Sequence, residues 1–130
     1  MVVGDRAFIS GNGAVHQFVR IGTLAMMQGG TVVSQDVAPY TIVHQMNITC
    51  GLNIIGLRRA GLKPEERLEL KRLYKKIFRS GQNFRSAVAE AQAEFKLGPS
   101  RVMLDFLAST KRGICCSAMD WRRSEEEAEM

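Results

Sequence analysis

The sequence predicts a β-solenoid followed by a small helical domain. Two observations support this fold class: a six-residue repeat runs through residues 3–38, and three apolar stripes with helical spacing follow residue 62. Extended, glycine-punctuated chain joins the two parts. The 130 residues, 45% of them apolar and 24% charged, suit one globular domain with an appendage.

The repeat becomes visible when residues 3–38 are written as six hexads. The first position is always apolar: Val3, Ile9, Val15, Ile21, Met27, Val33. The fifth position is always small or β-branched: Ala7, Gly13, Val19, Ala25, Thr31, Val37. A chain that turns through equal faces needs one inward bulky residue per face and a small one near each corner, where Gly, Asn and Asp tolerate positive φ. A meander of ordinary strands would not keep one phase over six repeats.

The pattern therefore predicts hexapeptide coils. With three faces per coil, residues 3–38 make two coils, and each repeat buries its core only against its neighbours. The open first coil would expose backbone and apolar side chains, so we expect a second chain or a preceding segment to cover it.

A connector is predicted over residues 39–62. Pro39 ends the repeat, and β-rich extended chain follows it. In "GLNIIGLRRAG" the glycines Gly51, Gly56 and Gly61 stand five residues apart. This spacing favours a looped connector with a short apolar turn rather than a regular element.

Three helices are predicted after the connector. The first begins at Pro64 and ends at Gly81, the second spans about Asn83 to Lys96 with Asn83 as cap, and the third runs from about Ser100 to Thr110. Their apolar stripes share i, i+3, i+4 spacing: Leu70, Leu73, Tyr74, Ile77, Phe78; Phe84, Ala87, Val88, Ala91, Phe95; Val102, Met103, Phe106, Leu107. These stripes would bury one another as a small bundle.

Composition narrows the classes of protein. No apolar run approaches the ~20 residues of a membrane span, and "MVVGDRAF" does not resemble a secretory signal, so we expect a cytoplasmic protein without membrane insertion. Cys50, Cys115 and Cys116 lack metal-ligand spacing, which favours free thiols. The net charge of +5, despite the acidic end "EEEAEM", favours an anionic partner, although no nucleic-acid motif is present.

Three segments resemble one known family. "GNGAVHQFVRIG", "SQDVAPYTI" and "GLNIIGLRRAG", in this order, are similar to the acyl-(acyl-carrier-protein)–UDP-N-acetylglucosamine O-acyltransferase family of lipid A biosynthesis, and the resemblance extends to about Gly113. It implies a left-handed parallel β-helix of hexapeptide repeats followed by a C-terminal helical domain. The implied divisions are 1–55 for coils and connector, 56–115 for the helical domain and 116–130 for a flexible acidic tail.

The resemblance also implies an activity. The family moves a 3-hydroxyacyl group from acyl carrier protein to the 3-hydroxyl of UDP-N-acetylglucosamine, as a homotrimer, with sites between subunits and without a metal or cofactor. Seven basic residues follow the connector: Lys63, Arg67, Lys71, Arg72, Lys75, Lys76, Arg79. They would form either a docking face for the acidic carrier protein or a solvated helix face, and both interpretations stay open.

The family's general base is a histidine of an earlier coil, in a motif similar to N-x-H-x-x-H-D, which is absent here. We therefore assign no catalytic residue, and expect the chain to correspond to the family's C-terminal half and to be inactive alone. His16 matches a later histidine that lines the substrate cleft, which gives it a supporting role. From the hexad alone, His16 lies beside the inward Val15, should point outward, and is better explained as a structural interface histidine.

The remaining candidate site residues come from the same resemblance. Gln35 and Gly29 match positions of the cleft where sugar and acyl chain meet, and Asn53 and Arg59 match positions at the nucleotide end. Ordinary corner chemistry explains Gly29 better, and Arg59 is alternatively a solvated charge. Two residues lie outside the transferable pattern: Ile55 replaces an acidic residue of some relatives, and His44 has no transferable role.

Three hypotheses follow for the function. The first is an acyltransferase of lipid A biosynthesis whose substrates are acyl carrier protein and UDP-N-acetylglucosamine. The second is a non-catalytic trimeric assembly or carrier-binding module. The third, a nucleic-acid-binding module, is supported by charge alone.

Overall fold

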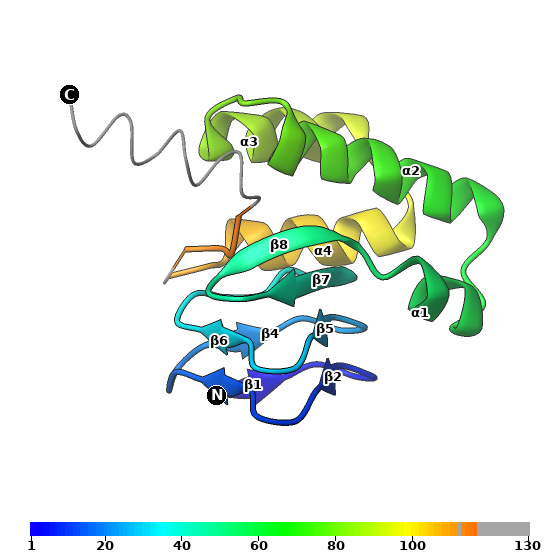
Figure 1. Ribbon diagram of the computed structural model, residues 1–130. Coiled ribbons are helices and arrows are strands. Elements are labelled where there is room, and N and C mark those ends of the chain that lie inside the picture. Colours follow the sequence, from blue (N-terminus) through cyan, green and yellow to red (C-terminus); the bar gives the residue numbers. More distant parts are fainter. Residues whose placement is uncertain (112, 117–130) are drawn as a thin grey trace.

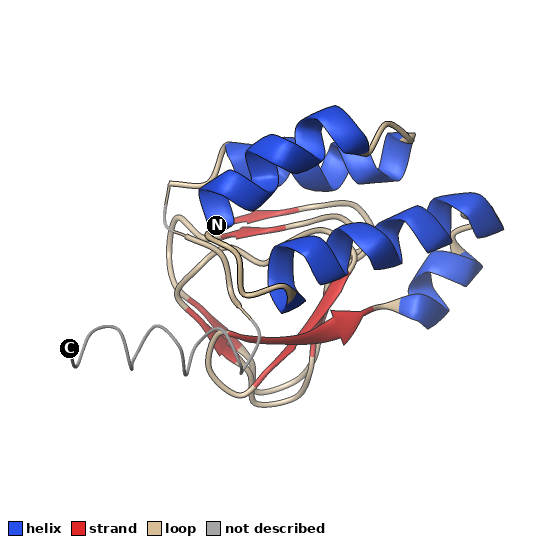
Figure 2. Cartoon of the chain, turned by 90° about the horizontal axis from the view of Figure 1, so that it is seen from above, coloured by secondary structure: helices blue, strands red, loops and turns tan. Residues whose placement is uncertain are grey.

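The computed structural model describes residues 1–111 and 113–116, and has a coiled β part covered at one end by helices (Figure 1). The strands are all short: β1 Val2–Val3, β2 Phe8–Ile9, β3 Ala14–Val15, β4 Arg20–Ile21, β5 Met26–Met27, β6 Val32–Val33, β7 Thr41–His44, β8 Ile48–Leu52. Seen from above, the helices lie over the coil (Figure 2). The expected acidic tail lies outside the described residues except for Cys116.

The first two coils share one parallel register. β1 pairs with β4, β2 with β5 and β3 with β6, and the partners are three six-residue steps apart in every case. Backbone bonds continue this stacking through the corners, for example from the His16 N–H to the Val33 carbonyl at 2.9 Å. Each face of the coil therefore begins its own small parallel sheet.

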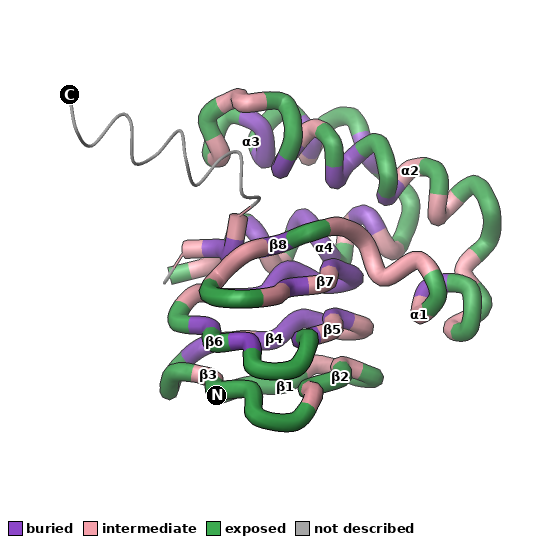
Figure 3. Tube along the Cα trace, in the orientation of Figure 1, coloured by how far each residue is buried: buried purple, intermediate pink, exposed green. Residues whose placement is uncertain are grey.

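Burial of the inward positions rises from coil to coil. Val3 and Ile9 are 43% and 38% exposed, whereas Ile21, Met27 and Val33 of the second coil are at most 1% exposed. Figure 3 shows this gradient as an exposed lowest coil beneath a buried one. Both coils have the same inward pattern, so the difference arises because a coil becomes core only when another coil lies on each side of it.

The repeat changes length after Val33. Val37 pairs with Ile21, and Val43 of β7 pairs with Met27, so the spacing between stacked partners falls from 18 residues to 16. Val32 and Met46 are only 14 residues apart, so the chain shortens again at the next corner. Two expectations are therefore wrong: the solenoid does not end at Pro39, and Val37 is an inward strand residue rather than a corner residue. Gly22 has no Cβ, and the Pro39 backbone packs directly where that atom would lie, as the Thr23 backbone does at Gly4 one coil earlier.

Left-handed residues mark the corners. The fourth position of five successive hexads has φ between +55° and +73°: Arg6, Asn12, Phe18, Leu24, Gly30. The sequence favours this conformation at Asn12 and Gly30, but L-residues such as Phe18 and Leu24 adopt it at a cost of roughly 1–2 kcal/mol each. Stacking on the neighbouring coil thus determines the corner geometry more than local preference does.

The predicted connector contains regular structure. β8 runs antiparallel to β7 and completes a four-stranded sheet, β2-β5-β7-β8. It leads directly into α1, Ile54–Arg59, where we had expected an irregular loop. Asn53 caps α1 by accepting the Gly56 N–H at 3.1 Å, and Gly56 lacks the Cβ that would collide with this amide.

The three predicted helices are present as α2 (Pro64–Tyr74) continued by the π-helical turn η1 (Lys75–Arg79), α3 (Phe84–Glu94) and α4 (Gly98–Ala108). The predicted stripes of α2–η1 and α3 are buried except for the half-buried Phe84. In α4 the prediction for Val102 is wrong, because this residue is 45% exposed. The inward stripe of α4 is Ser100, Met103, Leu104, Leu107.

A buried carboxylate joins the coils to the helices. Asp36, 2% exposed, accepts the Arg20 backbone N–H at 2.8 Å, its Nε at 3.4 Å and the Thr110 hydroxyl at 2.8 Å. The Arg20 guanidinium also stacks 4.2 Å from the centre of the Phe106 ring in α4. The Asp36 N–H donates to the Gly113 carbonyl at 2.9 Å, so the chain after α4 returns to the third coil at the same point.

Replacing Asp36 with Ala should destabilise the protein by about 3 kcal/mol, because the Arg20 guanidinium would be left partly buried without its anion. The measurement is the free energy of unfolding in urea. Asp105→Ala is the matched control, since Asp105 is exposed and lies 4.0 Å from Arg101, and should change the value by about 0.5 kcal/mol or less. Equal effects of the two changes would contradict the central role of Asp36.

Gly22→Ala should destabilise the fold by about 2–3 kcal/mol, because the new methyl group would overlap the Pro39 backbone. Gly11→Ala is the control, because no atom beyond its chain neighbours lies within 4 Å of a Cβ at that position. Urea midpoints of both variants test the prediction. A midpoint for Gly22→Ala that matches the control would show that the third coil does not depend on this contact.

Candidate functional site

The candidate site residues lie at three different corners of the coil. His16 and Gln35 lie at the corner that follows β3 and β6, and Gly29 lies at the corner between β5 and β6. Asn53 follows β8 and contacts Leu24, at the corner between β4 and β5. The short strands place each corner rigidly, since every strand is paired to its neighbour in the next coil.

His16 and Gln35 occupy neighbouring coils at one corner. His16 is exposed and its Nδ1 lies 3.3 Å from the Gln17 carbonyl oxygen. Gln35 is half-buried, and its backbone N–H donates to Asn47 Oδ1 at 3.3 Å. A Cβ on Gly113 would lie 3.1 Å from Gln35 Nε2, so the Gln35 amide lies against the returning chain. An imidazole and an amide at one corner provide hydrogen bonds to a polar ligand.

The Asp36 carboxylate, next to Gln35 in sequence, is engaged elsewhere. Its oxygens accept from Arg20 and Thr110. Asp36 therefore has no oxygen left unengaged by these donors. The supporting role of His16 stays a prediction.

The environment of Gly29 is ordinary. A Cβ at Gly29 would lie 3.7 Å from the Gly11 carbonyl oxygen and from Ser10 Oγ, which is normal van der Waals contact. The neighbouring Gly30 has the left-handed φ of +73° and donates its N–H to the Gly11 carbonyl at 3.2 Å. The backbone therefore needs glycine at 30, whereas side-chain space is available at 29.

Asn53 has a structural task in the chain. Its Nδ2 donates to the Leu24 carbonyl at 3.0 Å, while its Oδ1 caps α1. It therefore fixes the start of α1 to the corner of the second coil. Arg59 is exposed in the last turn of α1, where a positive charge is favoured by the helix dipole. Ile55 is 66% exposed.

Sequence reasoning missed an apolar surface beside His16. We define this outer apolar face as Phe18, Val32 and Met46, which are 71%, 41% and 65% exposed. Val32 and Met46 are bridged in parallel on successive coils. The sequence gives no regular signal for this face, because Phe18 and Val32 occupy different hexad positions and Met46 lies beyond the hexads. Exposed apolar residues that gather on one face indicate a protein interface or an apolar ligand.

The thiol nearest to Gln35 is chemically quiet. Burial raises the pKa of Cys115 to about 12, with smaller contributions from the negative charges of the nearby Cys116 and Asp36. The protonated thiol lies 3.5 Å from the Gln35 carbonyl oxygen and 3.6 Å from Asn47 Oδ1. A thiol that remains protonated at neutral pH is a poor nucleophile, so Cys115 packs the corner.

The described residues contain neither a metal-binding cluster nor a membrane-spanning helix. Within residues 1–111 and 113–116, no three His, Cys, Asp or Glu side chains are grouped so as to hold a metal ion. In the same part of the chain, no helix has the length and apolar character needed to cross a membrane.

One chain does not bring the candidate residues together. The corner with His16 and Gln35 and the corner with Asn53 are separated by the β1–β4 face of the coil. A cleft that contains both sets needs the corner of one copy to face another corner of a second copy.

Comparisons with known proteins agree with this architecture. A family profile described as UDP-N-acetylglucosamine O-acyltransferase, domain 2, matches residues 36–115. The acyl-[acyl-carrier-protein]–UDP-N-acetylglucosamine O-acyltransferase of Alkalilimnicola ehrlichii is 42% identical over 114 residues, which are 86% of this chain and 44% of that protein. The protein of the same name from Anaeromyxobacter sp. strain K is 39% identical over 88% of this chain and 45% of its own length.

Solved structures show the same likeness. The UDP-N-acetylglucosamine acyltransferase of Bacteroides fragilis matches with a TM-score of 0.81 and 36% identity, over 86% of this chain and 45% of that one. The Arabidopsis enzyme matches with a TM-score of 0.79 and 36% identity, over 88% and 44%. The fold is thus that of a β-solenoid protein with a helical end, and it is shared with solved UDP-N-acetylglucosamine acyltransferases. The chain belongs to the UDP-N-acetylglucosamine O-acyltransferase family, and it spans about half the length of the relatives it matches.

Cys115 should resist alkylation in the native protein at pH 8, since a thiol with a pKa of about 12 is then thiolate in about one molecule in 10⁴. Burial also raises the pKa of Cys50, but this residue is exposed and should react first. Iodoacetamide labelling followed by peptide mass spectrometry, with and without denaturant, measures both. Native labelling of Cys115 as fast as of Cys50 would disprove the buried corner.

Proposed function

We propose that the chain carries coils and the helical domain of an O-acyltransferase that moves a 3-hydroxyacyl group from acyl carrier protein to the 3-hydroxyl of UDP-N-acetylglucosamine. The observation that supports this most is the match of residues 36–115 to the family, together with relatives that are named for this reaction. The coils would be left-handed hexapeptide coils, as the family resemblance implies.

The proposed site lies between copies of a homotrimer. The corner of His16 and Gln35 on one copy would face Asn53 and Arg59 on its neighbour, because a single chain holds these sets at separate corners. His16 and Gln35 would bind the sugar and the acyl oxygen. Arg59, exposed and forked, would bind the diphosphate.

The outer apolar face supplies the reason to associate. Phe18, Val32 and Met46 are exposed in one copy next to the His16 corner. Burying them against a neighbour would remove apolar surface from water and would place an apolar wall beside the polar groups. An acyl chain would fit such a boundary.

Acyl carrier protein would approach the helical end. Lys71, Lys75 and Arg79 are exposed on α2 and η1, and an acidic carrier would be attracted to them in a salt-dependent way. The chain contains no N-x-H-x-x-H-D motif, so acyl transfer would require a base from outside these residues. This absence also supports the second candidate, a non-catalytic trimeric or carrier-binding module.

Calorimetry with UDP-N-acetylglucosamine, combined with sedimentation, tests the proposal. The wild-type chain should sediment as a trimer and bind the sugar nucleotide. Arg59→Gln should weaken binding by about tenfold, in line with a lost charge-assisted hydrogen bond. Val32→Asp combined with Met46→Asp should yield monomers that do not bind, whereas Val102→Asp, on an exposed site of α4, should change neither property.

Different outcomes of these measurements would contradict different parts of the proposed function. A wild-type monomer would remove the intersubunit site. A trimer that binds carrier protein but no sugar nucleotide would favour the non-catalytic module. Acyl transfer by the chain alone would show that it contains its own base and would exclude that module.

A further inference from the structure

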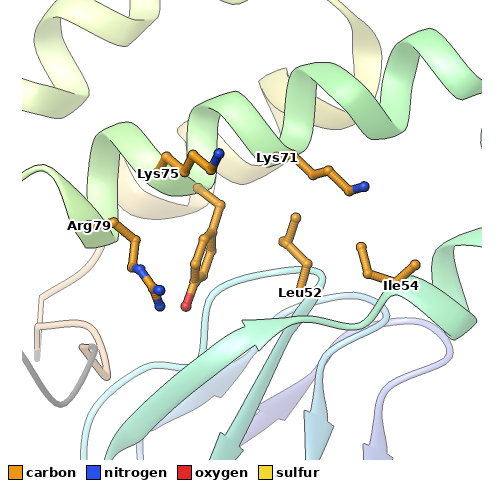
Figure 4. Close-up of a pocket in the computed structure, with 6 residues that line it drawn as sticks. Leu52, Ile54, Lys71, Lys75 and Arg79 are labelled. Carbon is orange, nitrogen blue, oxygen red and sulfur yellow. The ribbon is translucent and has the colours of Figure 1, made fainter.

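A pocket lies between the helical domain and the end of β8. None of its lining residues belongs to the His16 corner. Its volume is about 240 Å³, and six residues line it: Leu52, Ile54, Lys71, Tyr74, Lys75, Arg79. Figure 4 shows Lys71, Lys75 and Arg79 on the helix side, with Leu52 and Ile54 on the opposite side. The candidate site residues are not among the six.

The apolar side of the pocket follows from the capping of α1. Asn53 turns its amide toward the Leu24 carbonyl, so the chain neighbours on either side of it, Leu52 and Ile54, are left to line the pocket. Both are half-buried. The cap therefore creates an apolar floor directly beneath a helix that carries cations.

The π-helical turn aligns those cations. In an α-helix, residues four apart are rotated by about 40°, so Arg79 would be about 80° away from Lys71 around the helix. A π-turn winds with about 4.4 residues per turn, so the step from Lys75 to Arg79 turns back by about 30°. Since η1 spans Lys75–Arg79, it returns Arg79 to the side of Lys71. π-Helical turns are rare in proteins overall, but those that occur are often found at functional sites. The alignment of the three cations by such a turn therefore favours a binding site here.

The lining specifies the chemistry of an occupant. Three of the six residues are cationic and none is acidic, while Leu52, Ile54 and the Tyr74 ring are apolar. The volume lies below the roughly 300–1,000 Å³ of sites for drug-sized ligands, which favours a small ligand. A short alkyl chain with one anionic end matches both the size and the charge.

We propose that this pocket binds a small amphipathic anion, a phosphate or carboxylate on a short alkyl chain. The anion lies against Lys75 and Arg79, where the guanidinium donates two hydrogen bonds, and the tail lies on Leu52 and Ile54. The proposal does not depend on acyl transfer. Such a ligand would occupy the same lysines that we propose for carrier docking, so it would compete with that partner.

Titration of the full chain with octyl phosphate, followed by calorimetry, tests the proposal. We expect saturable binding of one octyl phosphate per chain. Inorganic phosphate and octanol, which each supply only one half of the ligand, should bind at least tenfold more weakly. Vesicles containing anionic lipid distinguish a lipid surface from a free amphiphile, and should bind no better than neutral vesicles.

Variants separate the two halves of the pocket. Lys75→Gln and Arg79→Gln should each weaken octyl phosphate binding by about tenfold. Arg85→Gln, an equal loss of charge at an exposed position of α3, should leave binding unchanged. Leu52→Trp fills the floor without altering any charge, and should prevent binding while circular dichroism confirms the fold.

Several results would overturn the inference. One is that octyl phosphate does not bind saturably, and another is that inorganic phosphate binds as tightly as octyl phosphate. A third is that Lys75→Gln, Arg79→Gln and Leu52→Trp all leave the affinity for octyl phosphate unchanged. Preferential binding to anionic vesicles without binding of monomeric octyl phosphate would assign these cations to a membrane surface instead.

Discussion

The buried ion pair between Asp36 and Arg20 is the interaction on which the other parts of the molecule depend. Asp36 lies on the third coil and Arg20 on the second, while Thr110 and Phe106 belong to the helical end. The helices also pack on Ala38 and Tyr40 in a shared apolar core, and this polar link lies beside it. A carboxylate that is 2% exposed must have several donors to be stable. Its satisfaction therefore requires both parts of the chain to be in place at once.

The same constraint separates structural from functional side chains at the candidate site. Asn53 and Asp36 have their polar atoms committed to backbone and side-chain partners within the chain. His16 is exposed at a corner of the first coil, and Arg59 is exposed in the last turn of α1. A site built from the exposed residues needs a second copy, whereas the octyl-anion pocket lies within one chain. The two proposals therefore differ in their dependence on assembly.

The sequence was a good guide wherever a pattern repeats. Inward apolar hexad positions and the stripes of α2 and α3 depend on side-chain type alone, and these residues are buried in the second coil and the helices. The shortening after Val33 was not predictable, because inward apolar residues do not show where the chain takes a shorter path between stacked strands. The left-handed corners at Phe18 and Leu24 were also missed, because stacking on the neighbouring coil determines them. At the site, family likeness indicated residues, but the corners that hold them became apparent only from the stacking.

The two-residue shortening after Val33 gives the solenoid a direction. Coils of equal length repeat by one screw operation, and a structure with such symmetry could add further units without limit. At the third coil the partners change spacing from Val33 onward, and β8 then reverses against β7. This end no longer presents the template that the first coil presents, so no further equivalent unit can be added there. The irregular coil therefore ends the regular stacking, and another equivalent coil could stack only on the opposite end of the solenoid.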